Sequence, residues 1–221
     1  MSLTSFTIHP AAQVASPATI SALEKTVVSH LSDNLQRMSG IYALRRIHRG
    51  KKLVGTAFTV KVRPGDNLLI YKALTLLQPG HVLVVDGSGH ETNALVGELI
   101  MLYAQQRGCA GFVLDAAVRD TNAFYEADFP CYARAVSHRG PYKNGPGAIN
   151  VPVSIDGQLV NPGDLIVGDE DGIVTFPAEA ADALISAAQK TLEHEEKIKA
   201  EISNGKVEQD WLHKVLSPFG L

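Results

Sequence analysis

Arg119 and Asp120 are adjacent charged residues of complementary chemistry, and they directly follow an apolar run that ends at Val118. A guanidinium group matches a carboxylate through two parallel hydrogen bonds, and a carboxylate oxygen is a ligand that Mg²⁺ accepts. The pair could therefore hold an anionic substrate beside a divalent cation. The same two residues could instead form a solvated ion pair, which is common on protein surfaces.

Glu98 is the second candidate, because it is the only charged residue in the apolar segment from Ala94 to Ala104. Glutamate is rarely buried unless it is paired or coordinating, so this one could lie on the wall of a cleft. Alternatively, Gly97 and Glu98 begin a helix, and the acid only complements the helix dipole. In either case, a helix that starts near Gly97 offers free backbone N–H groups to an anion.

Two apolar runs are expected to position these candidates. Val82–Asp86 and Gly111–Asp115 flank a helix that ends at Gly108, which is the pattern of two buried parallel strands joined by a crossover. Ligands of open α/β sheets bind beyond the carboxyl ends of such strands. We therefore expect the segments Asp86–His90 and Asp115–Asp120 to open on the same crevice.

Patterns elsewhere along the chain predict the remaining elements. Ser16 followed by Pro17 marks a helix start, and the apolar positions that follow keep helical spacing as far as Leu31. Residues 32–34 could cap a second short helix that ends near Gly40. The other expected elements are a strand over 53–62, a helix over 67–77, short strands between 131 and 174, and a long helix over 178–202.

Length and charge narrow the class of protein. The 221 residues suit one α/β domain over 1–221, with a core over about 16–177 and a C-terminal helical arm over about 178–221. The formal net charge of −3 provides no overall basic field, so we expect no nucleic-acid partner. The basic run over 45–52 is accordingly predicted to be a solvated hairpin tip.

Signals for membranes, export and disulfide scaffolds are missing from the sequence. Residues Met1–Phe6 contain neither the basic segment nor the long apolar segment of a signal peptide. The longest apolar stretch, Ala94–Ala104, is too short to cross a bilayer. Two cysteines are too few for a disulfide framework. We expect a soluble, cytoplasmic protein with no membrane partner.

Several common catalytic motifs are also missing. Gly87-Ser-Gly89 supplies two glycines but not the third of the dinucleotide fingerprint, and there is no phosphate-binding loop, G-x-S-x-G, H-E-x-x-H or paired C-x-x-C motif. Lys61, Lys72 and Lys143 have no obvious apolar setting that would activate a Schiff-base lysine. The sequence therefore gives little support to nucleotide-dependent or Schiff-base chemistry.

A series of short motifs, taken in order along the chain, can be compared with those of known protein families. In chain order they are Gly55-Thr-Ala57, Thr59-Val60, Gly65-Asp-Asn67, Pro79-Gly80, Val84-Val-Asp-Gly87, Gly97-Glu98-Leu99, Asp115 with Val118-Arg119-Asp120, Val151-Pro-Val153, Pro162-Gly-Asp164 and Gly168-Asp-Glu-Asp-Gly172. Together they resemble the RraA-like family, which joins 4-hydroxy-4-methyl-2-oxoglutarate aldolases with regulators of ribonuclease activity A. One departure from the family's pattern is Ala116, because glycine is common at this position in the family. Alanine fits if this position has a negative φ.

The resemblance implies a fold and a set of site residues. The expected fold is a three-layer β/β/α swivelling domain that assembles as a homotrimer or as a hexamer made of two trimers. Asp120 matches the direct protein ligand of Mg²⁺ or Mn²⁺, and Arg119 matches the residue that holds the pyruvyl part of the substrate. The segment Gly97, Glu98, Leu99 and Ile100 matches the backbone that contacts the substrate carboxylate.

Two acidic roles also follow from the resemblance. Glu98 resembles an acid that holds a metal-bound water, and a glutamate from a neighbouring subunit's C-terminal helix is expected to act similarly. Glu195 and Glu196 are the candidates for that second glutamate.

The expected function is that of a metal-dependent (class II) aldolase. Its small-molecule substrate would be 4-hydroxy-4-methyl-2-oxoglutarate or a related 4-hydroxy-2-oxo dicarboxylic acid, which it cleaves to release pyruvate. Oxaloacetate decarboxylation should accompany cleavage, because both reactions pass through the same enolate. The alternative is a non-catalytic regulator that binds and inhibits a ribonuclease.

Overall fold

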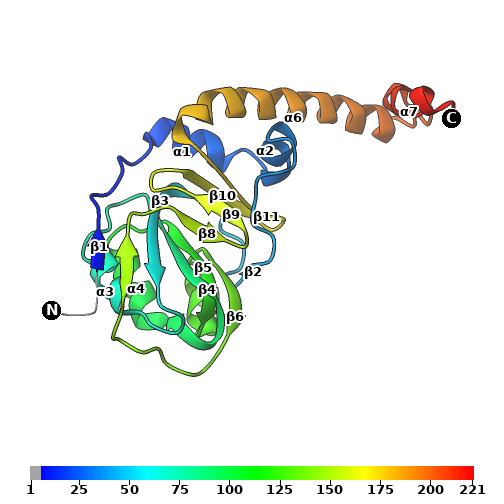
Figure 1. The fold of residues 1–221 in the computed structure, drawn as a ribbon. Helices are drawn as coiled ribbons and strands as arrows, with labels where there is room; N and C mark the ends of the chain where they lie inside the picture. The colour runs from blue at the N-terminus through cyan, green and yellow to red at the C-terminus, as the bar shows by residue number, and fades with distance from the viewer. Residues whose placement is uncertain (1–5) are drawn as a thin grey trace.

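Four parallel strands form the centre of the computed structural model, which describes residues 6–221 (Figure 1). Residues 1–5, which hold most of the segment inspected for a signal peptide, lie outside the described residues. In spatial order the strands are β3 (Leu53–Val62), β4 (His81–Val96), β5 (Gly111–Val118) and β6 (Cys131–Val136). The predicted strand over 53–62 and the predicted parallel pair are confirmed.

One face of this sheet is covered by three short helices. They are α3 (Leu68–Leu74), α4 (Glu98–Gln106) and α5 (Thr121–Ala127). Their inward side chains, among them Ile70, Met101 and Phe124, pack on Phe58 and Phe112 of the strands, and all five are almost fully buried. Each such side chain contributes roughly 1.5–3 kcal/mol, so this apolar layer holds the three helices against the sheet.

The opposite face of the sheet is covered by β-structure. A hairpin of β8 (Val153–Ile155) and β9 (Gln158–Val160) packs there, together with side chains of β10 (Leu165–Asp169) and β11 (Gly172–Phe176). The helices, the central sheet and this second β layer form the β/β/α arrangement that was expected. Short edge strands complete the sheet: β1 (Phe6–Ile8), β7 (Gly147–Ile149) and β2 (Arg45–Arg46).

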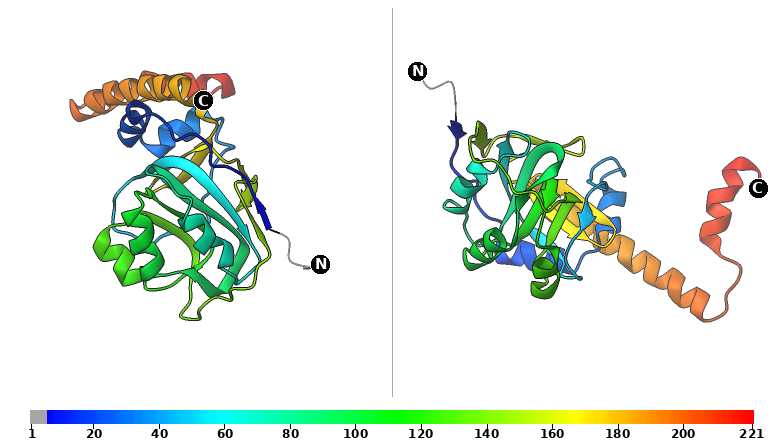
Figure 2. Two further views of the ribbon diagram at one scale, coloured as in Figure 1. Left: turned by 90° about the vertical axis from the view of Figure 1, so that its left-hand side faces the viewer. Right: turned by 90° about the horizontal axis from the view of Figure 1, so that it is seen from below.

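A third apolar cluster joins the N-terminal helices to the C-terminal helix. Helices α1 (Pro17–Glu24), α2 (Val28–Asn34) and α6 (Ala181–Ser203) pack with β10 and β11, after the short 3₁₀ turn η1 (Ala178–Ala180). Helix α6 then extends beyond the body and leads to α7 (Asp210–Leu216) and the 3₁₀ turn η2 (Ser217–Phe219), as Figures 1 and 2 show. Within residues 6–221, no helix has the length and apolar character needed to cross a membrane.

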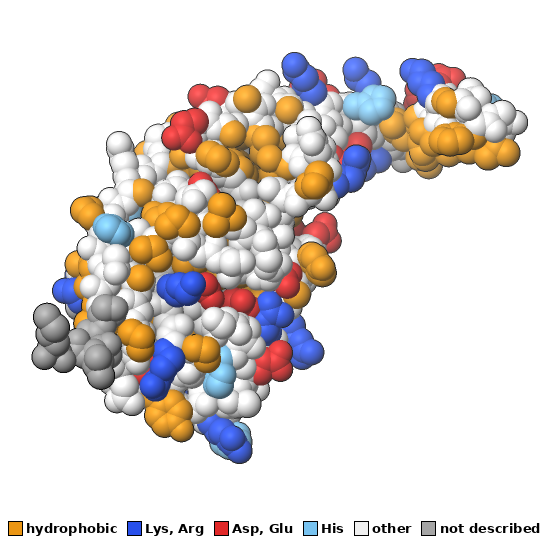
Figure 3. Space-filling view, viewed as in Figure 1, with side chains coloured by type: hydrophobic (Ala, Val, Ile, Leu, Met, Phe, Trp, Pro, Cys, Tyr) orange, Lys and Arg blue, Asp and Glu red, His pale blue; other side chains and the backbone are white. Residues whose placement is uncertain are grey.

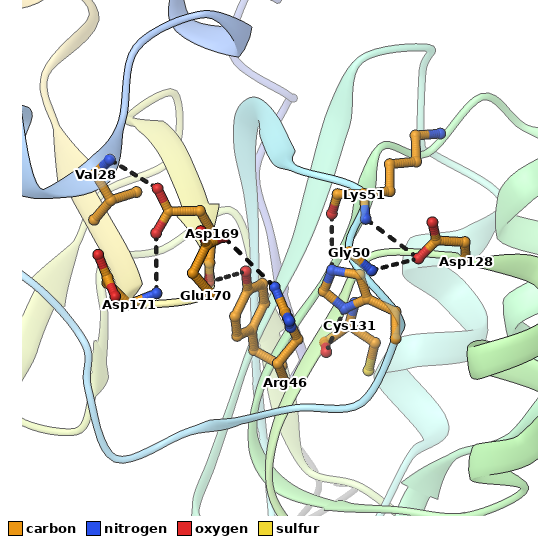
Figure 4. Close-up of polar contacts among 11 residues, drawn as sticks. Val28, Arg46, Gly50, Lys51, Asp128, Cys131, Asp169, Glu170 and Asp171 are labelled. Atoms are coloured by element: carbon orange, nitrogen blue, oxygen red, sulfur yellow. Dashed lines mark hydrogen bonds and ion pairs between the residues drawn. The ribbon is translucent and has the colours of Figure 1, made fainter.

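The predicted first helix differs from the observed structure after its start. Ser16 caps α1 as expected, with its Oγ accepting a hydrogen bond from the Thr19 N–H at 3.1 Å. The helix ends at Glu24, however, and α2 begins at Val28, whose N–H donates to Asp169 at 2.8 Å (Figure 4). This helix start is thus set by a carboxylate far along the chain, which local periodicity does not reveal. The predicted second helix, capped by residues 32–34 and ending near Gly40, does not form: residues 32–34 are the last turn of α2, and the backbone then turns at Gln36 and Arg37, whose φ angles are positive.

Two further boundaries differ from the prediction. Helix α3 ends at Leu74 rather than near Leu77. Strand β4 does not end at Asp86: it continues to Val96 with register shifts relative to β5. The predicted strand stopped at Asp86, before the Gly87-Ser-Gly89 run, but here these residues belong to an irregular strand held by its neighbour.

The basic run over 45–52 is largely exposed, as predicted, but it is not the tip of a hairpin. Its first residues form β2, which pairs with β6, and His48 is buried. The Cys131 N–H donates to His48 Nδ1 at 3.0 Å, and His48 Nε2 lies 2.8 Å from the Lys51 carbonyl oxygen. Asp128 accepts the N–H groups of Gly50 and Lys51 (Figure 4). Burial lowers the pKa of His48, so the neutral ring serves as an internal hydrogen-bonding group.

Candidate functional site

A small pocket lies where the end of β5 meets the start of α4. It brings together five of the six residues that the sequence singled out: Gly97, Leu99, Ile100, Arg119 and Asp120. The sixth, Glu98, joins through its backbone, because its N–H donates to Asp120 Oδ2 at 3.1 Å. The remaining lining residues are Asn67, Tyr71, Ala94, Leu95, Val96, Pro141 and Lys143.

The position of Asp120 follows from the end of β5. The Arg119 N–H donates to the Val96 carbonyl oxygen at 3.1 Å, which joins the end of β5 to the end of β4. Asp120 then adopts a left-handed conformation, with φ of 57°, and precedes α5. Its carboxylate is 44% exposed and lies 3.5 Å from Arg119 Nε, so the two charged groups face the solvent-accessible pocket. Ala116 is absent from the residues with positive φ, so its side chain causes no backbone strain.

The first turn of α4 provides hydrogen-bond donors to the same pocket. Helix α4 begins at Glu98 with Gly97 as its N-terminal cap, as the sequence indicated. The N–H groups of Leu99 and Ile100 donate to no acceptor among residues 6–221, and both residues line the pocket. Unpaired N–H groups at a helix N-terminus attract anions. This edge of the pocket can therefore bind a carboxylate.

Gly97 allows the charged pair to approach the helix this closely. A Cβ atom at this position would collide with Asp120 Oδ2 and would lie 2.9 Å from Arg119 Cγ. The backbone of Gly97 is extended, with φ of −154°, so space rather than backbone conformation requires glycine here.

The variant Gly97→Ala is expected to displace Arg119 and Asp120. It should lower kcat/KM of a reaction catalysed in this pocket by about 100-fold, because a displacement of about 1 Å in a reacting group costs that much. The melting temperature should change little, since the colliding groups are partly exposed. Gly50→Ala is the matched control, because a Cβ there meets no atom within 4 Å. A wild-type rate for Gly97→Ala would contradict the assignment of this site.

The glutamates named from the sequence are placed differently from one another. The Glu98 side chain is exposed on the first turn of α4, and it is not among the residues that line the pocket. Glu195 lies on α6, where its Oε2 is 3.0 Å from His30 Nε2 of the same chain. Glu196 pairs with Lys199 at 3.0 Å. Neither α6 glutamate lines this chain's pocket, so each would reach such a pocket only in another copy.

Two polar residues of the pocket were not assigned to the site from the sequence: Lys143, which was considered only as a Schiff-base lysine, and Asn67, which was noted only as part of a motif. Lys143 stands on a loop and places its Nζ 5.8 Å from the centre of the Tyr71 ring. Asn67 is 1% exposed; its Nδ2 donates to the Leu95 carbonyl oxygen, whereas its Oδ1 has no partner within residues 6–221. The Gly65-Asp-Asn67 motif was the available signal, but its distance from Arg119 along the chain gave no indication that Asn67 and Arg119 line the same pocket.

Asp66 holds the loop that carries Lys143. Its buried carboxylate accepts backbone N–H groups from Leu68, Asn144 and Gly145 at 3.0, 2.6 and 3.1 Å. Burial raises the pKa of this carboxyl group, whereas the three hydrogen bonds and the nearby Arg63 guanidinium group lower it, and the net shift is downward from 3.8. The ionised form of Asp66 is therefore the one that stabilises this loop.

Asp66→Asn is expected to lower the free energy of unfolding by about 2–3 kcal/mol at pH 7, because an amide cannot accept all the buried donors. Since the pKa of Asp66 is lower in the folded state than in the unfolded state, the stability that Asp66 contributes is fully present at neutral pH. It should decline as the pH falls below about 5, and the two urea-unfolding curves should converge in acid. Asp182→Asn, at an exposed position of α6, is the control. Parallel pH profiles for wild type and Asp66→Asn would contradict this role.

The residues present fit a weakly held divalent cation. Asp120 Oδ1 accepts no hydrogen bond from any described residue and is available as a ligand. No group of three or more His, Cys, Asp or Glu side chains within residues 6–221 could hold a metal by itself. Mg²⁺ suits such a site, because it keeps several waters and needs only one or two carboxylates together with a substrate.

The segment Asp86–His90 does not share this pocket, so the predicted common crevice is wrong for it. Asp86 and Asp115 are neighbours in register across β4 and β5, as expected of strand ends. Their partners, however, are other side chains: Lys61 Nζ lies 3.9 Å from Asp86, and Arg134 Nε binds Asp115. The extension of β4 beyond Asp86 carries the chain onward before the pocket is formed.

Comparisons with known proteins agree with this arrangement. Residues 28–175 match the model of the RraA-like family, described as Aldolase/RraA. A Halalkalibacterium halodurans protein with the provisional name 4-hydroxy-4-methyl-2-oxoglutarate aldolase is 35% identical over 194 residues, which cover 87% of this chain and 91% of that protein.

Two solved structures are also similar to this chain. The RNA-processing inhibitor RraA from Thermus thermophilus is 30% identical with a TM-score of 0.64, and the match covers 69% of this chain and 93% of that one. A Streptomyces coelicolor member of the RNase ES inhibitor RraA family is 26% identical with a TM-score of 0.78, and the match covers 85% and 98% of the two chains.

Proposed function

This chain belongs to the RraA-like family, and we propose that it is a divalent-metal-dependent aldolase that cleaves a 4-hydroxy-2-oxo dicarboxylic acid to pyruvate. One observation carries the proposal: Arg119, Asp120 and the N–H groups of Leu99 and Ile100, which have no acceptor among the described residues, meet in a single pocket. A guanidinium, a metal-binding carboxylate and an anion-binding helix end suit an oxo acid whose bond cleavage generates negative charge. The proposed substrate is 4-hydroxy-4-methyl-2-oxoglutarate or a close relative.

Substrate binding is assigned to this chain's own donors. The N–H groups of Leu99 and Ile100 bind the carboxylate next to the keto group, and Arg119 holds the pyruvyl oxygens. Lys143 gives the pocket a second cationic side chain, which suits a substrate with two carboxylates. Asp120 would hold Mg²⁺ or Mn²⁺, and the bound cation would supply Lewis acidity to the 2-keto oxygen.

The proposed reaction needs one proton acceptor and one stabilised product anion. A water held by Glu98, or by a neighbouring acid, accepts the proton of the C4 hydroxyl group. The C3–C4 bond then breaks, C4 becomes a carbonyl carbon, and the electron pair forms the enolate of pyruvate. Arg119 stabilises this enolate, and protonation at C3 yields pyruvate. Oxaloacetate loses CO₂ to give the same enolate, so decarboxylation is proposed as a side activity.

The proposal includes an oligomer. Glu195 or Glu196 would act on the pocket of a neighbouring copy within a homotrimer or a hexamer, because neither reaches the pocket of its own chain. No nucleic acid or membrane is proposed as a partner.

Pyruvate release from a panel of 4-hydroxy-2-oxo acids, measured with Mg²⁺ and again with EDTA, tests this function. We expect turnover that EDTA removes and that added Mg²⁺ restores. Turnover that persists in EDTA would refute metal dependence, and no pyruvate from any acid in the panel would refute the aldolase.

The second candidate is a regulator that binds and inhibits a ribonuclease. The two solved structures described as inhibitors of RNA processing or of RNase ES support it. The candidates differ in their dependence on the pocket: Asp120→Asn should remove pyruvate release, whereas inhibition through a surface should survive this change.

A further inference from the structure

Asp164 differs from the other buried acidic residues of the chain. Among residues 6–221 four acidic side chains are buried, and three of them have a cationic partner: Asp66 with Arg63, Asp86 with Lys61 and Asp115 with Arg134. Asp164 is 7% exposed and forms no ion pair within these residues. A buried charge costs free energy unless it is paired, so Asp164 lacks the partner that the fold provides for the other three.

One oxygen atom of the Asp164 carboxylate is bound within the fold and the other is not. Oδ2 accepts the Asn161 N–H at 2.8 Å, and Asn161 Nδ2 lies 3.4 Å from the same atom. Oδ1 accepts no hydrogen bond from residues 6–221, and it is not sealed from the pocket that Asp164 lines. Oδ1 is therefore available to a donor that enters this pocket.

The pocket beside Asp164 has the size of a small-molecule site. It lies between the segment 12–19, the turn 162–165 and the start of η1, and we name it the Asp164 pocket. Its volume is about 490 Å³, which falls within the range of about 300–1,000 Å³ that is typical of ligand sites. It shares no lining residue with the pocket that holds Arg119 and Asp120.

The charge of the Asp164 pocket is negative and is not compensated. Glu179 is its second acidic residue, and no described Lys, Arg or His lines it. Burial raises the pKa of Asp164 and the Glu179 carboxylate adds to the rise, whereas the Asn161 hydrogen bonds lower it; the net shift is upward from 3.8. Figure 3 shows acidic side chains where α6 begins, with the lysine and arginine side chains of the arm further along it. A cation in the pocket would stabilise both carboxylates.

The other lining groups suit a cation that donates hydrogen bonds. The hydroxyl oxygens of Ser16 and Thr19 can accept from an N–H group, and Val14, Pro162 and Leu165 provide apolar contacts for an aliphatic chain. A metal ion fits less well, because no group of three or more His, Cys, Asp or Glu side chains within the described part of the chain could hold one. A single ion would also leave most of the pocket volume unused.

We propose that the Asp164 pocket binds an organic cation through a primary ammonium or guanidinium group. This group donates a charge-assisted hydrogen bond to Asp164 Oδ1 and lies close to Glu179, while the aliphatic part of the ligand contacts the apolar wall. The site is separate from the proposed aldolase pocket, and binding to it does not depend on that activity.

Isothermal titration of the wild-type protein with butylamine, which is a primary ammonium ion at neutral pH, tests the site. We expect saturable binding at one site per chain. Butanol has the same length without the charge and should bind at least about ten-fold more weakly, which is the value of one charge-assisted hydrogen bond. Mg²⁺ should not displace butylamine. Absence of saturable butylamine binding, equal binding of butanol, or displacement by Mg²⁺ would each overturn the proposal.

Asp164→Asn is expected to weaken butylamine binding by roughly ten- to a hundred-fold. The asparagine amide oxygen can still accept the Asn161 N–H, so the turn should persist. Glu179→Gln, at an exposed position, should also weaken binding and provides a variant without a buried substitution. Asp171→Asn replaces an exposed acid outside the pocket and should bind as the wild type does.

Circular dichroism confirms that each variant is folded. Unchanged affinity in Asp164→Asn and Glu179→Gln, or an equal loss in Asp171→Asn, would show that butylamine binds elsewhere and would overturn the proposal. A capped lysine, N-acetyl-lysine methylamide, separates two sources of the cation. Tighter binding of butylamine than of the capped lysine indicates a free amine, and the reverse order indicates a basic side chain of a peptide.

Discussion

Replacing Asp120 with asparagine is expected to reduce metal-dependent pyruvate release by more than about 100-fold, since even residues that only support a metal ligand cost 10–100-fold when they are changed. Asparagine tolerates the left-handed conformation that Asp120 adopts, and its amide oxygen can still accept the Glu98 N–H. The variant therefore removes the charge and preserves the local geometry. Asp120→Ala should be equally inactive, with a small additional loss of stability from backbone strain.

Asp128→Asn provides the matched control for this prediction. Asp128 also has a positive φ, of 46°, and also accepts backbone N–H groups, but it lies outside the pocket. Its replacement should leave pyruvate release unchanged. Isothermal titration with Mg²⁺ or Mn²⁺ provides a readout that does not depend on turnover, and Asp120→Asn should bind the cation more weakly. A kcat close to that of the wild type at limiting Mg²⁺ would contradict the role of Asp120.

Arg119→Lys is expected to lower kcat/KM for aldol cleavage and for oxaloacetate decarboxylation together, because both reactions need the same enolate. An ammonium group cannot reproduce the planar two-point contact of a guanidinium group. The loss of one charge-assisted contact is worth about 1.5–3 kcal/mol, which corresponds to roughly ten- to a hundred-fold in rate.

A metal titration separates this role from a purely structural one. If Arg119 only supports Asp120, 3.5 Å away, the variant should bind the cation weakly and recover full activity in excess Mg²⁺. If Arg119 contacts the substrate, both rates stay low at saturating metal. Arg139→Lys, at an exposed position outside the pocket, serves as the control and should behave as the wild type. Complete rescue by metal would exclude the substrate contact.

The sequence by itself determined the features that depend on local patterns. Apolar runs predicted β3 and the parallel pair of β4 and β5, because a strand buried on both faces needs apolar residues at every position. The glycine before Glu98 predicted the start of α4, and Ser16 predicted the start of α1. Arg119 and Asp120 could be identified as candidates because they directly follow a strand, where ligands of such sheets bind.

Tertiary structure alone decided which distant residues meet. Asp169 sets the start of α2 from 141 residues away, and Asp66 fixes the loop that brings Lys143 to the pocket. Pairing with β5 carries β4 through a glycine-rich stretch that reads locally as a turn. For α2 and for the Asp66 loop, burial lets a hydrogen bond to a distant segment outweigh local preference, because an unpaired buried polar group is costly. The largely exposed stretch of β4 after Gly87 instead follows its neighbour through strand pairing. Residue spacing along the chain contains no record of such contacts.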